Sequence, residues 1–187
     1  LTNNAELASK MRLLRSHGVT RDPDLMTHEA DGSWYYQQVE LGFNYRMTEL
    51  QAALGNSQMT RLDEYVDRRN YLAQKYDVFL QTLPVISPWQ DKANYSARHL
   101  YVIRLKLDQI DKTHLEVFES LLEQGIGVNL HYIPVHTQPY YKKMGFKEGD
   151  FPNAESYYQE AISLPLFPKL SDEEQGKVIT ALKLVLN

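Results

Sequence analysis

Apolar residues near the start of the chain recur every three to four positions, a spacing typical of one face of a helix. The helix is predicted to begin at Asn3, with Glu6 placed to complete a capping box, and to end at Gly18. Residues 19–42 show no regular period and are predicted to be irregular. An irregular stretch of this length in a compact domain is usually functional or mobile.

A second and much longer helical pattern begins at Thr48. Gln51 lies three residues later, so the two side chains can form a capping box. The apolar spacing continues, with room for a kink, as far as Leu83. Because a helix of this length is expected to leave one domain and enter another, we predict domains over residues 1–65 and 66–187.

Beyond residue 95, runs of apolar and β-branched residues alternate with helical patterns. Strands are predicted over residues 99–105, 127–133 and 162–167, and helices are predicted to begin near Thr113, Asp150 and Ser171. In the helix after Thr113, we expect Leu115, Phe118 and Leu122 to face inward. The alternation predicts an α/β fold in which helices cover a sheet.

Composition narrows the classes of function. The 187 residues are 43% hydrophobic, which is enough for a packed core, and they carry a net charge of −4. The charge gives no footprint for nucleic acid, and no apolar run approaches the length of a membrane span. The chain has no cysteine, which excludes disulfides and thiolate metal sites and fits a reducing, cytoplasmic location.

The segment from Gly42 to Thr48 combines features that suit a phosphate. Asn44 and Arg46 supply an amide and a guanidinium just before the helix that begins at Thr48. Free backbone N–H groups and the helix dipole favour negative charge at such a terminus. The alternative is an Asn in a tight turn and an Arg on a solvated surface.

His131 and His136 flank Pro134 at the end of a predicted strand. Two histidines with no carboxylate or cysteine pattern beside them make a poor metal site, so no metal is expected. A role in proton transfer or in hydrogen bonding to a substrate is possible, because imidazole titrates near neutrality. The alternative is that they are half-exposed histidines without a function. The charged positions 63–64 and 68–69 are expected to form a solvated helix face.

The chain resembles the sugar-nucleotide aminotransferases of the DegT/DnrJ/EryC1/StrS type, which use pyridoxal 5'-phosphate (PLP). The matching segments occur in the order of that family and span nearly the whole chain; they are LTNNAELASKMRLLRSHG, LGFNYRMTELQAALGNSQMTRLDEYVDRR, RHLYVIRL, GIGVNLHYIPVHTQPYY, GDFPNAESYYQEAISLPLFP and LSDEEQGKVITAL.

The resemblance implies the C-terminal part of a fold-type I aminotransferase. Residues 1–65 would be the helical tail of the large cofactor-binding domain, and residues 66–187 a small C-terminal α/β sandwich domain. The family's Schiff-base lysine lies upstream of the TNN element, and no lysine of this chain sits in a matching motif. We therefore expect the C-terminal portion of a longer enzyme, inactive by itself and without a catalytic residue of its own.

The resemblance also implies roles for particular residues. Asn44 and Arg46 would bind the cofactor, with Asn44 reaching the PLP phosphate of the neighbouring subunit, so that a homodimer shares its active sites. The residues expected to contact the sugar-nucleotide substrate are His131, Tyr132, Arg21 and His136.

The implied reaction transfers an amino group, commonly from glutamate, to a keto-sugar nucleotide for surface-polysaccharide or amino-sugar biosynthesis. Two other functions are compatible with the sequence. One is a pyridoxamine-dependent sugar dehydratase of the same family, in which histidine replaces the lysine. The other is a non-catalytic dimerisation or binding module.

Overall fold

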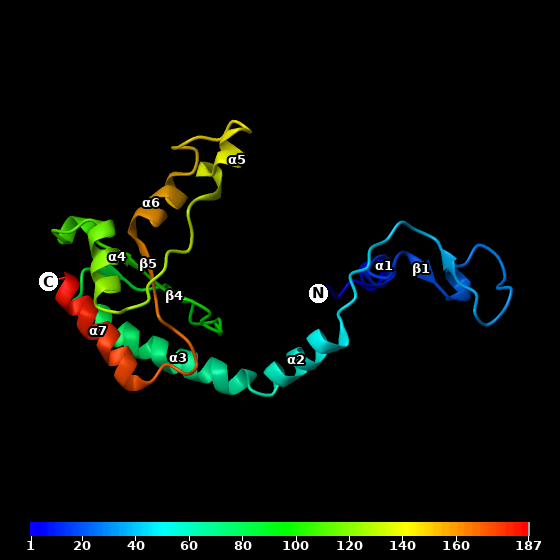
Figure 1. The fold of residues 1–187 in the computed structure, drawn as a ribbon, viewed down its shortest axis with the longest axis horizontal. Helices are drawn as coiled ribbons and strands as arrows, with labels where there is room; N and C mark the ends of the chain where they lie inside the picture. Colours follow the sequence, from blue (N-terminus) through cyan, green and yellow to red (C-terminus); the bar gives the residue numbers. More distant parts are fainter. Residues whose placement is uncertain (187) are drawn as a thin grey trace. The chain divides into compact units, whose positions relative to one another are not determined.

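The structure is a computed structural model that describes residues 1–186. The chain forms two compact units, one over Leu1–Thr60 and one from Arg61 onward. The α-helices (Figure 1) are α1 (Ala5–Leu14), α2 (Glu49–Met59), α3 (Leu62–Phe79), α4 (His114–Glu123), α5 (Pro139–Lys142), α6 (Pro152–Glu160) and α7 (Asp172–Leu186). The strands are β1 (Val19–Thr20), β2 (Gln37–Gln38), β3 (Val85–Ile86), β4 (Tyr101–Leu105) and β5 (Ala161–Leu164). Among the described residues, none of the helices is long and apolar enough to cross a membrane.

The first unit begins with α1, which is capped by Asn4 and not by Asn3, so that prediction was wrong by one residue. The Asn4 side chain accepts a hydrogen bond from the Leu7 N–H at 2.9 Å. After the helix the backbone turns at Gly18, whose φ of 68° is left-handed. A Cβ at this position would lie 1.8 Å from the Glu40 carbonyl oxygen, so only glycine fits.

The segment between α1 and α2 is less irregular than its sequence predicts. β1 and β2 pair as an antiparallel ribbon of two residues each, a feature too short to give a periodic pattern. The buried side chain of Gln37 accepts a hydrogen bond from the Thr27 N–H at 2.8 Å and so ties the intervening loop to the ribbon.

The predicted long helix is two helices. Thr48 and Gln51 form the predicted capping box at the start of α2. The helix is interrupted between Met59 and Leu62, and the boundary between the two compact units falls at the same place in the sequence. No residue of α2 is buried, and the side chain of Leu50 is 84% exposed.

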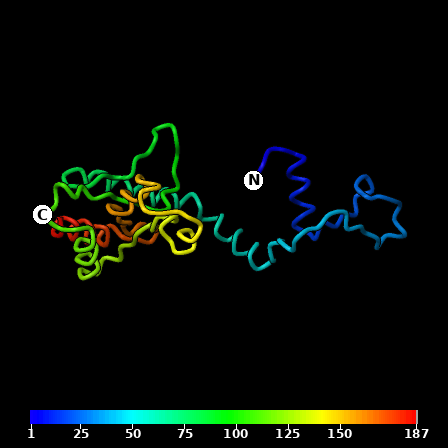
Figure 2. Tube along the Cα trace, turned by 90° about the horizontal axis from the view of Figure 1, so that it is seen from above, coloured from blue at the N-terminus to red at the C-terminus, as the bar shows by residue number. Residues whose placement is uncertain are grey.

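The second unit is built on an antiparallel sheet in the order β3-β4-β5, with Val85 opposite Leu105 and Tyr101 opposite Leu164. Residues 87–100, between β3 and β4, form a loop that projects from the unit (Figure 2). The α/β class predicted for this part of the chain is confirmed.

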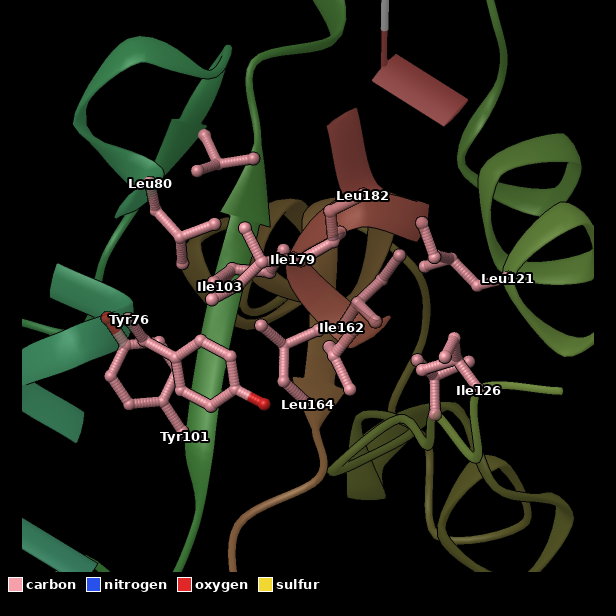
Figure 3. Packing of buried hydrophobic residues seen from close by; sticks show 14 of the residues in the cluster. Tyr76, Leu80, Tyr101, Ile103, Leu121, Ile126, Ile162, Leu164, Ile179 and Leu182 are labelled. Atoms are coloured by element: carbon pink, nitrogen blue, oxygen red, sulfur yellow. The ribbon is translucent and has the colours of Figure 1, made fainter. Parts of the chain in front are cut away.

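Side chains from the sheet and from α3, α4 and α7 form the hydrophobic core (Figure 3). Tyr76 of α3 packs against Tyr101 of β4, with ring centroids 4.9 Å apart. Buried Gln175 of α7 donates from Nε2 to the Leu72 carbonyl of α3 at 2.7 Å. The strand and the two helices are thus fixed to one another by both apolar and polar contacts.

Several local predictions for this unit were wrong. In α4 the buried residues are Val117 and Leu121, whereas Leu115 is 62% exposed and Leu122 is also exposed. Of the three residues expected to face inward, only Phe118 packs against the core. The helix therefore turns its 117/121 face to the core, where it packs against α7, and both faces carry leucine in the sequence.

Residues 127–133 form no regular strand. A single bridge pairs Asn129 with Ser163. Arg68 and Arg69 do not form a solvated face either. Arg68 bonds to Asp172 at 2.8 Å, and Arg69 donates to the Leu166 carbonyl at 2.9 Å.

Candidate functional site

In the first unit, hydrogen bonds tie the loop before α2 to the end of α1. Asn44 forms an antiparallel bridge with Ser16, and the Tyr45 N–H donates to the Arg15 carbonyl at 2.9 Å. The neighbouring Phe43 ring stacks on Tyr45, with centroids 4.9 Å apart. The backbone on either side of Asn44 is therefore held in place, while the Asn44 side chain remains exposed.

Asn44 and Arg46 lie together, as the sequence predicts for a phosphate-binding loop. Arg46 Nε donates to Asn44 Oδ1 at 3.3 Å. The contact orients the amide, because a guanidinium N–H can only donate and must face the amide oxygen. Within residues 1–186, the Asn44 Nδ2 hydrogens have no acceptor, and both side chains are exposed. Two donor groups are therefore available to an anion.

The start of α2 adds free backbone donors five and six residues after Asn44. The Thr48 hydroxyl accepts the hydrogen bond of the Gln51 N–H. The N–H groups of Glu49 and Leu50 precede the first intrahelical hydrogen bonds and have no acceptor within the part of the chain that the structure describes. This end of the helix carries the positive pole of its dipole.

A surface pocket of about 530 Å³ lies beside Arg46. His17, Tyr36 and Gln38 contribute to its wall, and Gln38 Nε2 donates to the His17 carbonyl at 2.9 Å. Arg21, two residues after Val19 of that wall, is exposed and does not line the pocket. Its predicted contact with substrate stays a prediction.

In the second unit, His131 is half-buried beside the sheet. Its Nδ1 lies 2.7 Å from Oγ of Ser163, a buried residue of β5. Tyr132 packs edge-on against the imidazole, with centroids 4.6 Å apart and planes at 85°, and is itself 72% exposed. The His131–Tyr132 peptide bond is cis. The two predicted substrate contacts thus form one small surface with a polar edge and an aromatic face.

His136 occupies a different environment, with only 7% of it exposed. Its Nε2 lies 2.7 Å from Glu155 Oε1, and the Gly149 N–H donates to the same carboxylate at 2.8 Å. The hydrogen bond from His136 lowers the pKa of Glu155 below its ordinary value. The imidazole also lines a pocket of about 340 Å³ with Phe146 and Phe151. The proposed contact of His136 with substrate stays a prediction.

The predicted site residues therefore form two groups, one in each unit. Asn44 and Arg46 are brought together in the first, and His131 and Tyr132 in the second. Sequence reasoning missed Ser163, which holds His131, because a serine inside an apolar run carries no local sign of its partner 32 residues away. Within residues 1–186 no three His, Asp or Glu side chains gather as a metal site would require.

The similarity to known proteins covers both groups of predicted site residues. Residues 1–183 match the DegT/DnrJ/EryC1/StrS aminotransferase family. The spore coat polysaccharide biosynthesis protein SpsC of Bacillus subtilis is 40% identical over 97% of this chain and 47% of its own length. A UDP-4-amino-4,6-dideoxy-N-acetyl-beta-L-altrosamine transaminase of Campylobacter jejuni is 35% identical over 91% of this chain and 43% of its own.

A solved structure shows the same fold. The PLP form of Spr1654 from Streptococcus pneumoniae superposes with a TM-score of 0.81 and 28% identity, over 100% of this chain and 46% of that one. The chain spans about half the length of the relatives that it matches. The match across residues 1–183, with relatives at 35–40% identity, means that the chain belongs to the DegT/DnrJ/EryC1/StrS aminotransferase family.

Proposed function

We propose that the protein containing this chain is a PLP-dependent aminotransferase that moves an amino group from glutamate to a keto-sugar nucleotide. Family membership, the transaminase among the relatives and the PLP form of a structural neighbour support the proposal. This reaction would belong to the biosynthesis of surface polysaccharides or amino sugars. A cytoplasmic location and a homodimer are part of the same proposal.

The observation that carries the proposal is the donor set in the first unit. Arg46 orients the Asn44 amide so that its N–H groups remain free, and unpaired backbone N–H groups follow at the start of α2. An amide, a guanidinium and helix N–H groups are donors and carry positive or partial positive charge. They therefore fit a phosphate dianion, which can only accept hydrogen bonds.

PLP, when bound, supplies an electron sink that makes amino transfer possible. Asn44 would hold its phosphate, and Arg46 would brace Asn44 or contact an anionic group of the substrate. The family resemblance suggests that Asn44 serves the site of the neighbouring subunit. The lysine that binds the cofactor covalently is expected outside this chain.

His131 and Tyr132 are proposed to contact the sugar nucleotide. The imidazole offers one nitrogen that is not engaged by Ser163, and the exposed Tyr132 ring offers an apolar face and a hydroxyl. Such a pair can bind a sugar through a hydrogen bond and through contact with its C–H groups. Contacts from Arg21 and His136 are part of the same proposal.

The test uses the protein at its natural length with PLP, glutamate and a nucleoside-diphosphate keto-sugar. We expect 2-oxoglutarate to form in step with a sugar nucleotide whose carbonyl oxygen has been replaced by an amine, as measured by mass spectrometry. Omitting glutamate should abolish both products. A deoxygenated sugar instead would favour the dehydratase, and failure to bind either PLP or the sugar nucleotide would favour a non-catalytic module.

A further inference from the structure

Ser163 holds the segment that carries His131 by three hydrogen bonds. Its backbone exchanges two of them with Asn129, from Ser163 N–H to the Asn129 carbonyl at 2.7 Å and from Asn129 N–H to the Ser163 carbonyl at 3.2 Å. Its side chain makes the third, with Oγ 2.7 Å from His131 Nδ1. Because Ser163 lies in β5 and is 4% exposed, the imidazole is fixed to the core sheet.

The burial of Ser163 decides which atom donates. His131 Nδ1 is the only hydrogen-bond partner of the Ser163 hydroxyl within residues 1–186. A buried hydroxyl that accepted from Nδ1–H would leave its own hydrogen without an acceptor, which is costly. The hydroxyl therefore donates to Nδ1, and the neutral ring carries its proton on Nε2.

The opposite edge of the ring is open. His131 Nε2 has no hydrogen-bond partner among the described residues, and it is not among the fully buried polar atoms that lack a partner, so it remains accessible. The edge-on contact with Tyr132 limits rotation of the ring from one side. The Nε2–H group is therefore unpaired among the described residues and not fully buried, on a ring held on two sides.

We propose that Ser163 is a positioning residue that holds neutral His131 in its Nε2–H tautomer and so makes it a hydrogen-bond donor. The group it recognises is an oxygen acceptor of the sugar nucleotide, from either the diphosphate or the sugar. This part rests on the proposed function, whereas the tautomer itself depends only on contacts within this chain. In this state His131 donates a hydrogen bond to an oxygen and does not act as a base through Nε2.

Nitrogen-15 NMR of the histidine side chains tests the tautomer directly, because protonated and unprotonated ring nitrogens have well-separated shifts. Two other histidines serve as internal references, since their Nε2 atoms face groups that only accept. These are His114, 3.0 Å from the Ala161 carbonyl, and His136, 2.7 Å from Glu155. The His131→Gln variant assigns the signal. At a pH where the ring is neutral, we expect His131 to show the Nε2–H pattern of the references. An Nδ1–H pattern would overturn the proposal.

The Ser163→Ala variant removes the hydroxyl and keeps the strand backbone. We expect the His131 signals to shift toward the average of a ring that exchanges between tautomers, while the signals of His114 and His136 stay in place. The Ser163→Thr variant retains a hydroxyl and should restore the Nε2–H pattern. An unchanged tautomer in folded Ser163→Ala protein would show that Ser163 does not set it and would overturn the proposal.

Ligand titrations of the protein at its natural length separate this inference from the proposed function. UDP carries the nucleoside diphosphate without the hexose, and UDP-N-acetylglucosamine carries the hexose as well. A shift of His131 Nε2 with UDP would assign an oxygen of the nucleoside diphosphate as acceptor, and a shift only with the sugar nucleotide would assign an oxygen of the hexose. Calorimetric binding without any Nε2 shift would overturn the donor role. If neither ligand binds, recognition of a uridine sugar nucleotide fails, and the tautomer measurements still decide the role of Ser163.

Discussion

Replacing Asn44 provides the sharpest test of the proposed phosphate site, because two substitutions there differ in charge. Asn44→Ala removes one oriented donor. A hydrogen bond to a charged group contributes roughly 1.5–3 kcal/mol, which corresponds to about a ten- to hundredfold loss in PLP affinity. The fold should survive, since the Asn44 side chain is exposed and the bridge to Ser16 uses the backbone.

Asn44→Asp changes the sign of the interaction. It replaces the free NH₂ group by a carboxylate oxygen that would face the phosphate. Two like charges about 4 Å apart at an effective dielectric constant of about 20 repel by on the order of 4 kcal/mol. We therefore expect Asn44→Asp to bind PLP far more weakly than Asn44→Ala, and the difference should shrink at high salt.

The assay is equilibrium binding of PLP to the protein at its natural length, followed by absorbance after dialysis. Asn3→Ala is the matched control, because Asn3 is another exposed asparagine, lying before α1. Thermal unfolding confirms that each variant is folded. If Asn44→Asp binds PLP as well as Asn44→Ala does, no anion lies beside this residue, and the phosphate assignment is refuted.

A mixed dimer tests whether Asn44 acts across the subunit interface. Chains carrying Asn44→Ala are combined with chains that lack the Schiff-base lysine. If Asn44 serves the neighbouring site, each mixed dimer contains one site with both lesions and one intact site, so activity should partly return. No recovery in dimers shown by mass spectrometry to be mixed would place Asn44 in the site of its own chain.

Three further predictions concern the second unit. Gln175→Leu should raise the free energy of unfolding, measured in urea titrations, by about 1 kcal/mol. The buried Oε1 has no partner within the described residues, and removing it gains more than the lost bond to the Leu72 carbonyl costs. A loss of stability would show that this oxygen is satisfied. Arg69→Met should lower that free energy by about 2 kcal/mol by removing charged donors to backbone carbonyls, and an unchanged midpoint would contradict it. The hydrogen bond from Lys75 is the main reason why the pKa of Asp172 falls from 3.8 to about 2. A depressed pKa stabilises the fold above pH 3.8, and this contribution is lost as the pH falls toward 2, so the stability difference from Asp172→Asn should vanish across that window.

Signals that lie within a few residues of each other were readable from the sequence. The capping boxes at Thr48 and Thr113 are present as predicted, because both partners lie within one turn of helix. Even there the sequence was ambiguous by one position at the first helix, since Asn3 and Asn4 can both cap and only Asn4 does. The α/β class followed from the alternation of periods.

Contacts between distant residues were not readable in the same way. Arg69 looked like a surface charge, yet its guanidinium reaches a carbonyl 97 residues away. The prediction of a strand over residues 127–133 was wrong. An apolar run indicates that residues are buried, but it does not show that a neighbouring strand can pair with them, and here only Asn129 forms a bridge. That Asn44 and Arg46 share one loop follows from their places in the sequence, whereas the orientation of the amide depends on a side-chain contact that the sequence does not specify.

The two groups of candidate site residues, one in each unit, differ in what holds them. His131 is bonded to Ser163, a residue of a core strand, so its orientation is as stable as the sheet. Asn44 lies in a unit where only Gly18, Thr20 and Gln37 are buried among the described residues, and its loop is held by hydrogen bonds to the end of α1. Because a ligand that binds the ordered form of a segment stabilises that form, a phosphate bound at Asn44 would order the loop that recognises it. Ligand binding should therefore protect backbone amides near Asn44 from hydrogen exchange much more than the amide of Asn129, which is already bonded to the Ser163 carbonyl of the core strand.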